Sequence, residues 1–345
     1  MRTHRLGRDG PAVTVATLGT MTFGRQNTQA EAHDQLDLAI GRGVNLVDAA
    51  EMYPVPAEER TQGLTERFVG SWLAKGPRDR VMVATKVTGP GRRFAWMRDG
   101  VQALTAEQVA LACEQSLSRL GTDHIDLYQI HWPARNVPKF GGWRFDPAAE
   151  VPAAPVDEQL RALDRLVREG KVRWIGLSNE TPWGVMSFLE AARSHGLARV
   201  ASVQNAYNLL NRVAESGLTE VLWREQVGML AYSPLAFGYL AGKYRDGVPA
   251  RSRVGEFANF SARYSKPGVA PAVAAYCDLA ASRGLTPVQL ALAFVASRPF
   301  VTSTIVGATS LAQLAENLDA FATTPDRDTL EAIDAIHLRH TNPAP

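Results

Sequence analysis

The sequence predicts a single domain over residues 1–345, folded as a (β/α)8 barrel, and three observations carry this prediction. Short runs rich in β-branched residues alternate with longer stretches of helical period, which indicates parallel strands joined by crossover helices. Eight such runs occur, and most are apolar throughout, as in a sheet covered on both faces. A doubly wound sheet is the second choice. It would need a glycine-rich phosphate loop after its first strand, and residues 19–24 have neither the G-x-G-x-x-G spacing nor a Walker lysine.

The bulk composition excludes several classes of protein. The chain is 46% hydrophobic and 21% charged, and its 37 Lys and Arg against 35 Asp and Glu give a net charge of +2. Without a basic block, a nucleic-acid partner is not expected. No apolar run is long enough to span a bilayer, and residues 1–10 lack the apolar core of a signal peptide, so no membrane association and a cytoplasmic location are predicted. Cys113 and Cys277 match no metal or redox spacing and are interpreted as small core residues.

Each strand and several helix starts can be placed. Thr181-Pro182 and Thr286-Pro287 each predict an N-cap followed by proline in the first turn, and Thr105 with Gln108 and Ser310 with Gln313 predict capping boxes. The predicted strands are Val15–Met21, Val44–Ala49, Val81–Lys86, Ile125–His131, Val172–Leu177, Ala201–Gln204, Gly228–Tyr232 and Ser303–Gly307.

Three segments exceed the minimal connections of a barrel. Residues 1–14 carry a Gly7–Gly10 turn between extended pieces, which predicts a hairpin that closes the barrel floor. Residues 132–156 and 233–271 follow strands. Loops after the strands of a barrel lie on its catalytic face, so both segments are expected to shape the ligand site.

Several predicted strands end in a polar residue. Asp48, Lys86 and His131 end three successive strands, and Tyr53 follows Asp48 by five residues. Because these ends share one rim of a barrel, we expect the four side chains to meet. A phenol has a pKa near 10, and an ammonium group beside it stabilises the phenolate; a shift of about two to three units corresponds to roughly 3–4 kcal/mol. Such a site suits protonation of a developing alkoxide, with a histidine to orient the carbonyl.

Simpler explanations exist for each residue alone: a capping aspartate, a solvated lysine, a rim tyrosine and a core histidine. Their joint placement favours chemistry. A metal-dependent hydrolase is the lowest-ranked alternative, because its metal would need several converging ligands and His131 is the one histidine that ends a predicted strand. No metal site is predicted.

Six motifs in this order resemble the aldo-keto reductase superfamily, in the branch related to the potassium-channel β subunits. The similarity extends from the hairpin to residues 342–345. The motifs are LGTMTFG at 18–24, NLVDAAEMY at 45–53, ATKV at 84–87, DLYQIHWP at 126–133, GKVRWIGLSN at 170–179 and QNAYNLLNR at 204–212.

The resemblance implies NADPH-dependent reduction of aldehydes, and secondarily of ketones, to alcohols, with Asp48, Tyr53, Lys86 and His131 as the catalytic tetrad. It implies a small-molecule carbonyl substrate and is compatible with a homo-oligomer. In this family pattern Ser178, Asn179 and Gln204 hold the carboxamide and Tyr232 stacks on the nicotinamide. The full set of implied cofactor residues is Gly19, Thr20, Met21, Asp48, Ser178, Asn179, Gln204, Tyr232, Ser233, Pro234, Leu235, Gly238, Lys243, Arg253, Gly307, Thr309, Gln313 and Asn317.

The sequence departs from the family pattern at two places. Gly307 and Gln313 stand where many members have Lys and Arg, and NADPH is still favoured over NADH because Lys243 and Arg253 can supply charge. The residues on either side of Tyr53, Glu51-Met52 and Pro54, also differ from the commoner loop. His131 is retained, whereas channel β subunits often have asparagine there.

An aromatic-walled substrate pocket is expected, with loops 88–103 and 132–156 deciding specificity. Its expected lining is Met21, Tyr53, Trp96, Trp132 and Trp143. A non-catalytic NADPH-binding module that reports redox state to a partner, as the channel β subunits suggest, is the alternative function.

Overall fold

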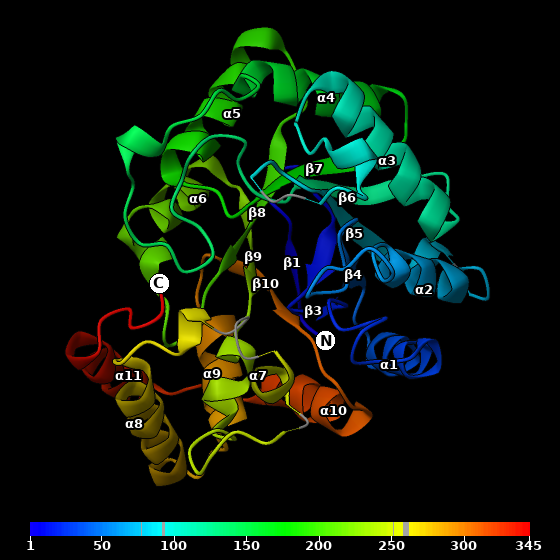
Figure 1. Ribbon diagram of the computed structural model, residues 1–345. Helices are drawn as coiled ribbons and strands as arrows, with labels where there is room; N and C mark the ends of the chain where they lie inside the picture. Colours follow the sequence, from blue (N-terminus) through cyan, green and yellow to red (C-terminus); the bar gives the residue numbers. More distant parts are fainter. Residues whose placement is uncertain (77, 92–93, 251, 258–261) are drawn as a thin grey trace.

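A computed structural model describes residues 1–76, 78–91, 94–250, 252–257 and 262–345 of the chain. Eight parallel strands close into a barrel in the order β10-β3-β4-β5-β6-β7-β8-β9 (Figure 1), which confirms the predicted fold class. The strand ends differ from the prediction by at most two residues, and β9 matches it at both ends. The strands are β3 (Ala16–Gly19), β4 (Leu46–Asp48), β5 (Met82–Val87), β6 (Ile125–Ile130), β7 (Val172–Ser178), β8 (Val200–Ala206), β9 (Gly228–Tyr232) and β10 (Val301–Val306).

Helices surround the barrel on the outside (Figure 1). Among the described residues no single helix is long and apolar enough to cross a membrane, although α8 and α9, bent by 95°, meet those criteria as a pair. The helices are α1 (Gln29–Gly41), α2 (Leu64–Leu73), α3 (Ala106–Leu120), α4 (Val156–Arg168), α5 (Pro182–His195), α6 (Leu218–Glu225), α7 (Arg253–Glu256), α8 (Val269–Ser282), α9 (Pro287–Ala296), α10 (Leu311–Asp319) and α11 (Arg327–Arg339).

The helix starts were predicted correctly, but two capping boxes were not. Thr181 and Thr286 cap α5 and α9 with proline in the first turn. Thr105 and Ser310 also accept the expected backbone N–H. The glutamine that should return the bond points elsewhere, however. Gln108 Oε1 accepts from Arg98 Nη1 at 3.2 Å, and Gln313 Oε1 accepts from the backbone N–H of Thr309 at 3.1 Å. Gln108 thus bonds to a residue ten positions earlier in the chain, and Gln313 bonds to one four positions earlier, just before the N-cap.

The predicted hairpin is present and closes one end of the barrel. Strands β1 (Thr3–Arg5) and β2 (Ala12–Thr14) pair antiparallel. Leu6 and Val13 are buried against residues of the barrel interior, among them Leu46, Ala84, Leu127, Leu230 and Ile305. The turn needs glycine, because Gly7 has a φ of +71° and a Cβ there would lie 2.5 Å from the carbonyl oxygen of Ala201.

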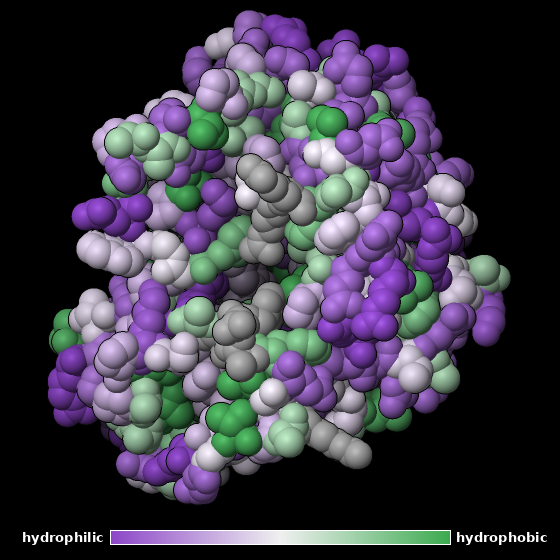
Figure 2. All heavy atoms as spheres, in the orientation of Figure 1, coloured by the Kyte–Doolittle hydropathy of each residue, from purple (hydrophilic) through white to green (hydrophobic). Residues whose placement is uncertain are grey.

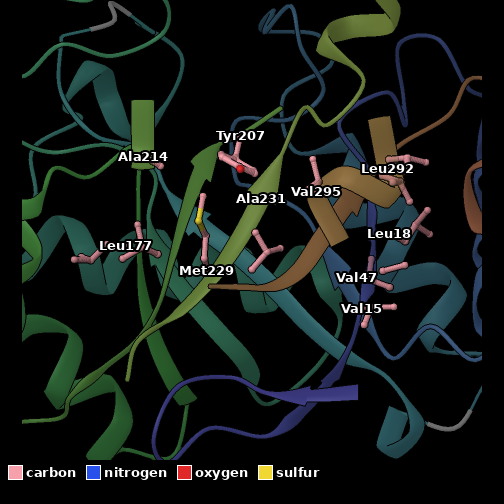
Figure 3. Packing of buried hydrophobic residues seen from close by; sticks show 14 of the residues in the cluster. Val15, Leu18, Val47, Leu177, Tyr207, Ala214, Met229, Ala231, Leu292 and Val295 are labelled. Atoms are coloured by element: carbon pink, nitrogen blue, oxygen red, sulfur yellow. The ribbon is translucent and has the colours of Figure 1, made fainter. Parts of the chain in front are cut away.

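The main core lies between the strands and the surrounding helices. Figure 3 shows Val47 and Leu18 from neighbouring strands, and Leu292 and Val295 of α9, in this cluster. Each fully buried aliphatic side chain of this kind contributes about 1.5–3 kcal/mol to folding. Cys113 and Cys277 are free thiols buried in α3 and α8, as predicted for small core residues. This packing holds the strand ends that carry the site.

Candidate active site

The four residues expected to act together do meet at the carboxyl ends of the strands. Lys86 Nζ lies 2.7 Å from Asp48 Oδ2 and 4.8 Å from the centre of the Tyr53 ring. The rings of Tyr53 and His131 meet edge to face, with centroids 5.6 Å apart. Parallel pairing of β4 with β5 and of β5 with β6 brings the ends of these strands together.

Asp48 and Lys86 form a buried ion pair, and additional hydrogen bonds hold both side chains in place. Lys86 is 0% exposed and Asp48 is 2% exposed. Lys86 Nζ also donates to the carbonyl oxygen of Ala49 at 2.7 Å, and Asp48 Oδ1 accepts from Gln204 Nε2 at 2.8 Å and from Gln129 Nε2 at 3.3 Å. Burial lowers the pKa of the Lys86 ammonium, and the Asp48 carboxylate opposes this change. The pair therefore has a fixed geometry beneath Tyr53.

Packing and backbone hydrogen bonds position Tyr53 above this pair. Its N–H donates to the carbonyl oxygen of Ala50 at 3.0 Å, and its carbonyl oxygen accepts from Gly63 at 2.9 Å. Its side chain belongs to a buried apolar cluster that also contains Met52, Phe94, Met97 and Trp132. Because Phe94 and Met97 come from loop 88–103, this loop forms part of the support of Tyr53.

A second buried ion pair joins the loop of Tyr53 to loop 88–103. Glu51 Oε1 lies 2.9 Å from Arg98 Nη2, and both side chains are 0% exposed. Glu51 Oε1 also accepts from the backbone N–H of Thr88, and Arg98 Nη2 donates to the Thr88 carbonyl oxygen at 2.9 Å. Burial raises the pKa of the Glu51 carboxyl, and the Arg98 cation opposes this change. Glu51 is one of the departures from the family pattern, and nothing in the sequence indicates its pairing with Arg98.

Replacing Arg98 by methionine is expected to lower the free energy of unfolding by about 3–5 kcal/mol, because Glu51 would keep a buried charge without its partner. The double variant Glu51→Gln/Arg98→Met removes both charges and should recover most of this loss. Urea unfolding of the two variants beside the unmodified protein measures the difference. Equal destabilisation by the single and the double change would show that the charge pairing contributes little.

A cavity of about 670 Å³ opens beside Tyr53 and His131, large enough for an extended ligand. Figure 2 shows the hollow near the centre of one face of the molecule. All eighteen residues that the family pattern assigns to the cofactor line this cavity, while the buried Lys86 lies behind its wall. The structure thus gathers into one cavity residues that are as far apart in the chain as Gly19 and Asn317.

Hydrogen bonds fix the wall of the cavity next to His131. Tyr232 Oη donates to Asn179 Oδ1 at 2.7 Å, and Asn179 Nδ2 donates to the carbonyl oxygen of His131 at 2.9 Å. Ser178 Oγ donates to the carbonyl oxygen of Gln204 at 2.8 Å. These side chains stand at the ends of β7 and β9, and their hydrogen bonds join this wall of the cavity to the barrel strands.

Two of the expected cations lie in the segment after β9. Gly238 has a φ of +95°, and a Cβ there would lie 2.5 Å from Lys243 Cε, so glycine lets Lys243 approach the backbone. The guanidinium of Arg253 lies 5.1 Å from the centre of the Phe237 ring. Both cations line the cavity, whereas Gln313 Oε1 is already bonded to Thr309.

The expected substrate lining needs correction at two tryptophans. Met21, Tyr53 and Trp132 line the cavity, but Trp96 and Trp143 are not among the described residues around it. Trp143 is 74% exposed, and Trp96 packs against Phe94 with ring centroids 5.5 Å apart. Both stand in long loops, where residue type does not predict direction.

The cavity also has lining residues that sequence analysis missed. Glu316 is one of them, and helical spacing could have revealed it, because Gln313, Glu316 and Asn317 share one face of α10. The segment after β9 contributes five more, which are Phe237, Ala241, Ser252, Ala262 and Arg263. These additional residues include Gln26, Met52, Phe140, Phe237, Arg263 and Glu316.

Known proteins resemble this chain along most of its length. The model of the aldo/keto reductase family matches residues 17–338. Protein tas of Escherichia coli is 47% identical over the full length of both chains. An aldo-keto reductase of Babesia bovis is 40% identical over 69% of this chain and 88% of its own. A putative voltage-gated potassium channel subunit beta of Schizosaccharomyces pombe is 28% identical over 96% of this chain and 92% of its own.

Proposed function

Because this chain belongs to the aldo/keto reductase family of oxidoreductases, we propose that it reduces aldehydes, and ketones more slowly, to alcohols with NADPH. The observation that carries the proposal is the Lys86 ammonium, 2.7 Å from Asp48 and 4.8 Å from the centre of the Tyr53 ring, at the end of a cavity. A cation in this place favours release of a phenol proton, which carbonyl reduction requires.

In the proposed reaction the cofactor supplies the hydride and Tyr53 supplies the proton. When bound, the reduced nicotinamide supplies the hydride to the carbonyl carbon. Tyr53 donates its proton to the carbonyl oxygen as negative charge develops there, and Lys86 stabilises the phenolate that is left. Asp48 keeps the ammonium in place, and His131, whose ring meets that of Tyr53, orients the carbonyl.

The residues around the cavity fit this cofactor. Asn179 and Gln204 offer side-chain amides, and Tyr232 offers a ring face, for the nicotinamide end. Lys243 and Arg253 supply positive charge for phosphates. The beginning of α10 next to Thr309, together with Asn317 further along the helix, suits the adenosine end.

The proposal is tested by following NADPH oxidation with a panel of aldehydes and ketones, with NADH in parallel. Turnover of aldehydes with NADPH, and weaker turnover with NADH, is the expected result. Preference for NADH would overturn the role given to Lys243 and Arg253. Tight NADPH binding without oxidation by any carbonyl would instead favour a redox-reporting module, the function suggested by the relatives named as channel subunits.

A further inference from the structure

A third cation of the cavity, Arg263, has no role in the scheme above. It lines the cavity together with Trp132, Phe140 and Tyr232. Its guanidinium bonds to the hydroxyl groups of Tyr232 and Tyr264, which are neutral partners. Within the part of the chain that the structure describes, Arg263 forms no ion pair. A guanidinium carries five N–H donors, and the two phenol oxygens do not use all of them. Because the phenols are neutral, the positive charge of Arg263 also remains available to a ligand in the cavity.

Arg263 stands at the reacting end of the cavity. The hydroxyl of Tyr232, to which it bonds, donates to Asn179, and Asn179 donates to the carbonyl oxygen of His131. Two side chains therefore separate the guanidinium from the backbone of His131. Lys243 beside Gly238 and Arg253 over Phe237 are the cations proposed for the cofactor phosphates.

A second positive group reinforces Arg263. Burial, and next the nearby charge of Arg263, lower the pKa of Lys266. Lys266 Nζ donates to the carbonyl oxygen of Gly141 at 3.0 Å, and a Cβ on Gly141 would lie 3.3 Å from Arg263 Cβ. The segment after β9 thus meets loop 132–156 beside Phe140, at the cavity wall. Within the described ranges neither cation has a carboxylate partner, and two such neighbouring cations favour an anion between them and the site.

We propose that Arg263 recognises an anionic group, a carboxylate or a phosphate, on the carbonyl substrate, so that the preferred substrates are negatively charged aldehydes. This inference rests on the proposed function and adds the substrate class to it. The anion would pair with the guanidinium while the carbonyl group lies between Tyr53 and His131. Apolar contacts with Trp132 and Phe140 would hold the part of the substrate between the two groups.

Matched substrate pairs test the inference. We would compare 4-carboxybenzaldehyde with its methyl ester, and glyceraldehyde 3-phosphate with glyceraldehyde, at constant ionic strength with NADPH. One charge-assisted contact predicts a kcat/KM roughly ten- to a hundredfold higher for the anionic member. The pair with the larger ratio identifies carboxylate or phosphate as the preferred group. The ratio should fall as salt is added.

Variants then assign the preference to Arg263. Arg263→Gln should lower kcat/KM for the anionic substrate and so remove most of its advantage over the neutral one. The kcat/KM for the neutral substrate and the KM for NADPH should each change by less than about twofold. Arg263→Lys should retain part of the advantage. Arg245→Gln is the control, because Arg245 belongs to the same segment and pairs with Asp278.

The possible outcomes separate this inference from the proposed function. Turnover of neutral aldehydes without preference for their anionic partners would overturn the inference and leave the proposed function standing. A rise in the KM for NADPH in Arg263→Gln, with the substrate ratio unchanged, would assign Arg263 to the cofactor and also overturn it. Absence of turnover with every carbonyl compound would contradict the proposed function itself.

Discussion

Replacing Tyr53 by phenylalanine is expected to lower kcat for aldehyde reduction by about 10²–10⁴-fold, because the change removes the proposed proton donor and keeps the ring. Tyr53 is 8% exposed and packs in an apolar cluster with Met52, Phe94 and Trp132, and phenylalanine keeps those contacts. The affinity for NADPH should therefore stay within about twofold of its original value. Steady-state kinetics give kcat, and a fluorescence titration with NADPH gives the affinity.

The control for this prediction is the free energy of unfolding. Because phenylalanine keeps the packing of the Tyr53 ring in its apolar cluster, the change should alter stability by less than about 1 kcal/mol, as urea unfolding would measure. If the phenylalanine variant kept its turnover, another group would have to donate the proton. If NADPH affinity fell together with kcat, Tyr53 would serve the cofactor rather than the reaction.

Replacing Lys86 by methionine should have two large effects at once. It removes the cation beneath Tyr53, which should lower kcat by about 10²–10³-fold. It also leaves the carboxylate of Asp48 buried without its counter-ion, at a cost of about 3–5 kcal/mol of stability. The amide donors Gln129 and Gln204 remain on Asp48 Oδ1 and should keep the cost toward the lower end.

The double variant Asp48→Asn/Lys86→Met separates these two effects. Removing both charges should restore most of the stability, because neither charge is then left unpaired. It should not restore kcat, because the ammonium group is still missing. Recovery of kcat in the double variant would mean that Lys86 acts through stability alone. Urea unfolding and NADPH oxidation, measured on the same preparations, give both quantities.

The sequence predicted the barrel and the meeting of the four candidate residues because both follow from strand order. Parallel strands in a closed barrel place all their carboxyl ends on one rim. Asp48 and Lys86 therefore had to be neighbours once β4 and β5 were recognised. The strand ends were less accurate, since β3 ends at Gly19 rather than at Met21.

Contacts made by loops could not be predicted in the same way. Arg98 reaches Glu51 from across loop 88–103, and neither residue has a local partner that signals the pair. Trp143 was expected in the pocket on residue type alone, and it lies on the surface. Arg263 appears in the sequence as one more basic residue in a long insertion. What places Arg263 at the site is its hydrogen bond to Tyr232, which is 31 positions earlier in the chain.

The closed floor of the barrel constrains how Tyr53, the proposed proton donor, would be reprotonated after each catalytic cycle. Below Asp48 lie the amides of Gln129 and Gln204, and beneath these the apolar plug that Leu6 and Val13 form with the strands. The hydrocarbon side chains of Leu6 and Val13 have no proton to give, so this plug separates the barrel interior from solvent at the floor. The replacement proton must therefore arrive through the same mouth as the substrate. Alcohol departure and the return of solvent would then set when the next cycle can start.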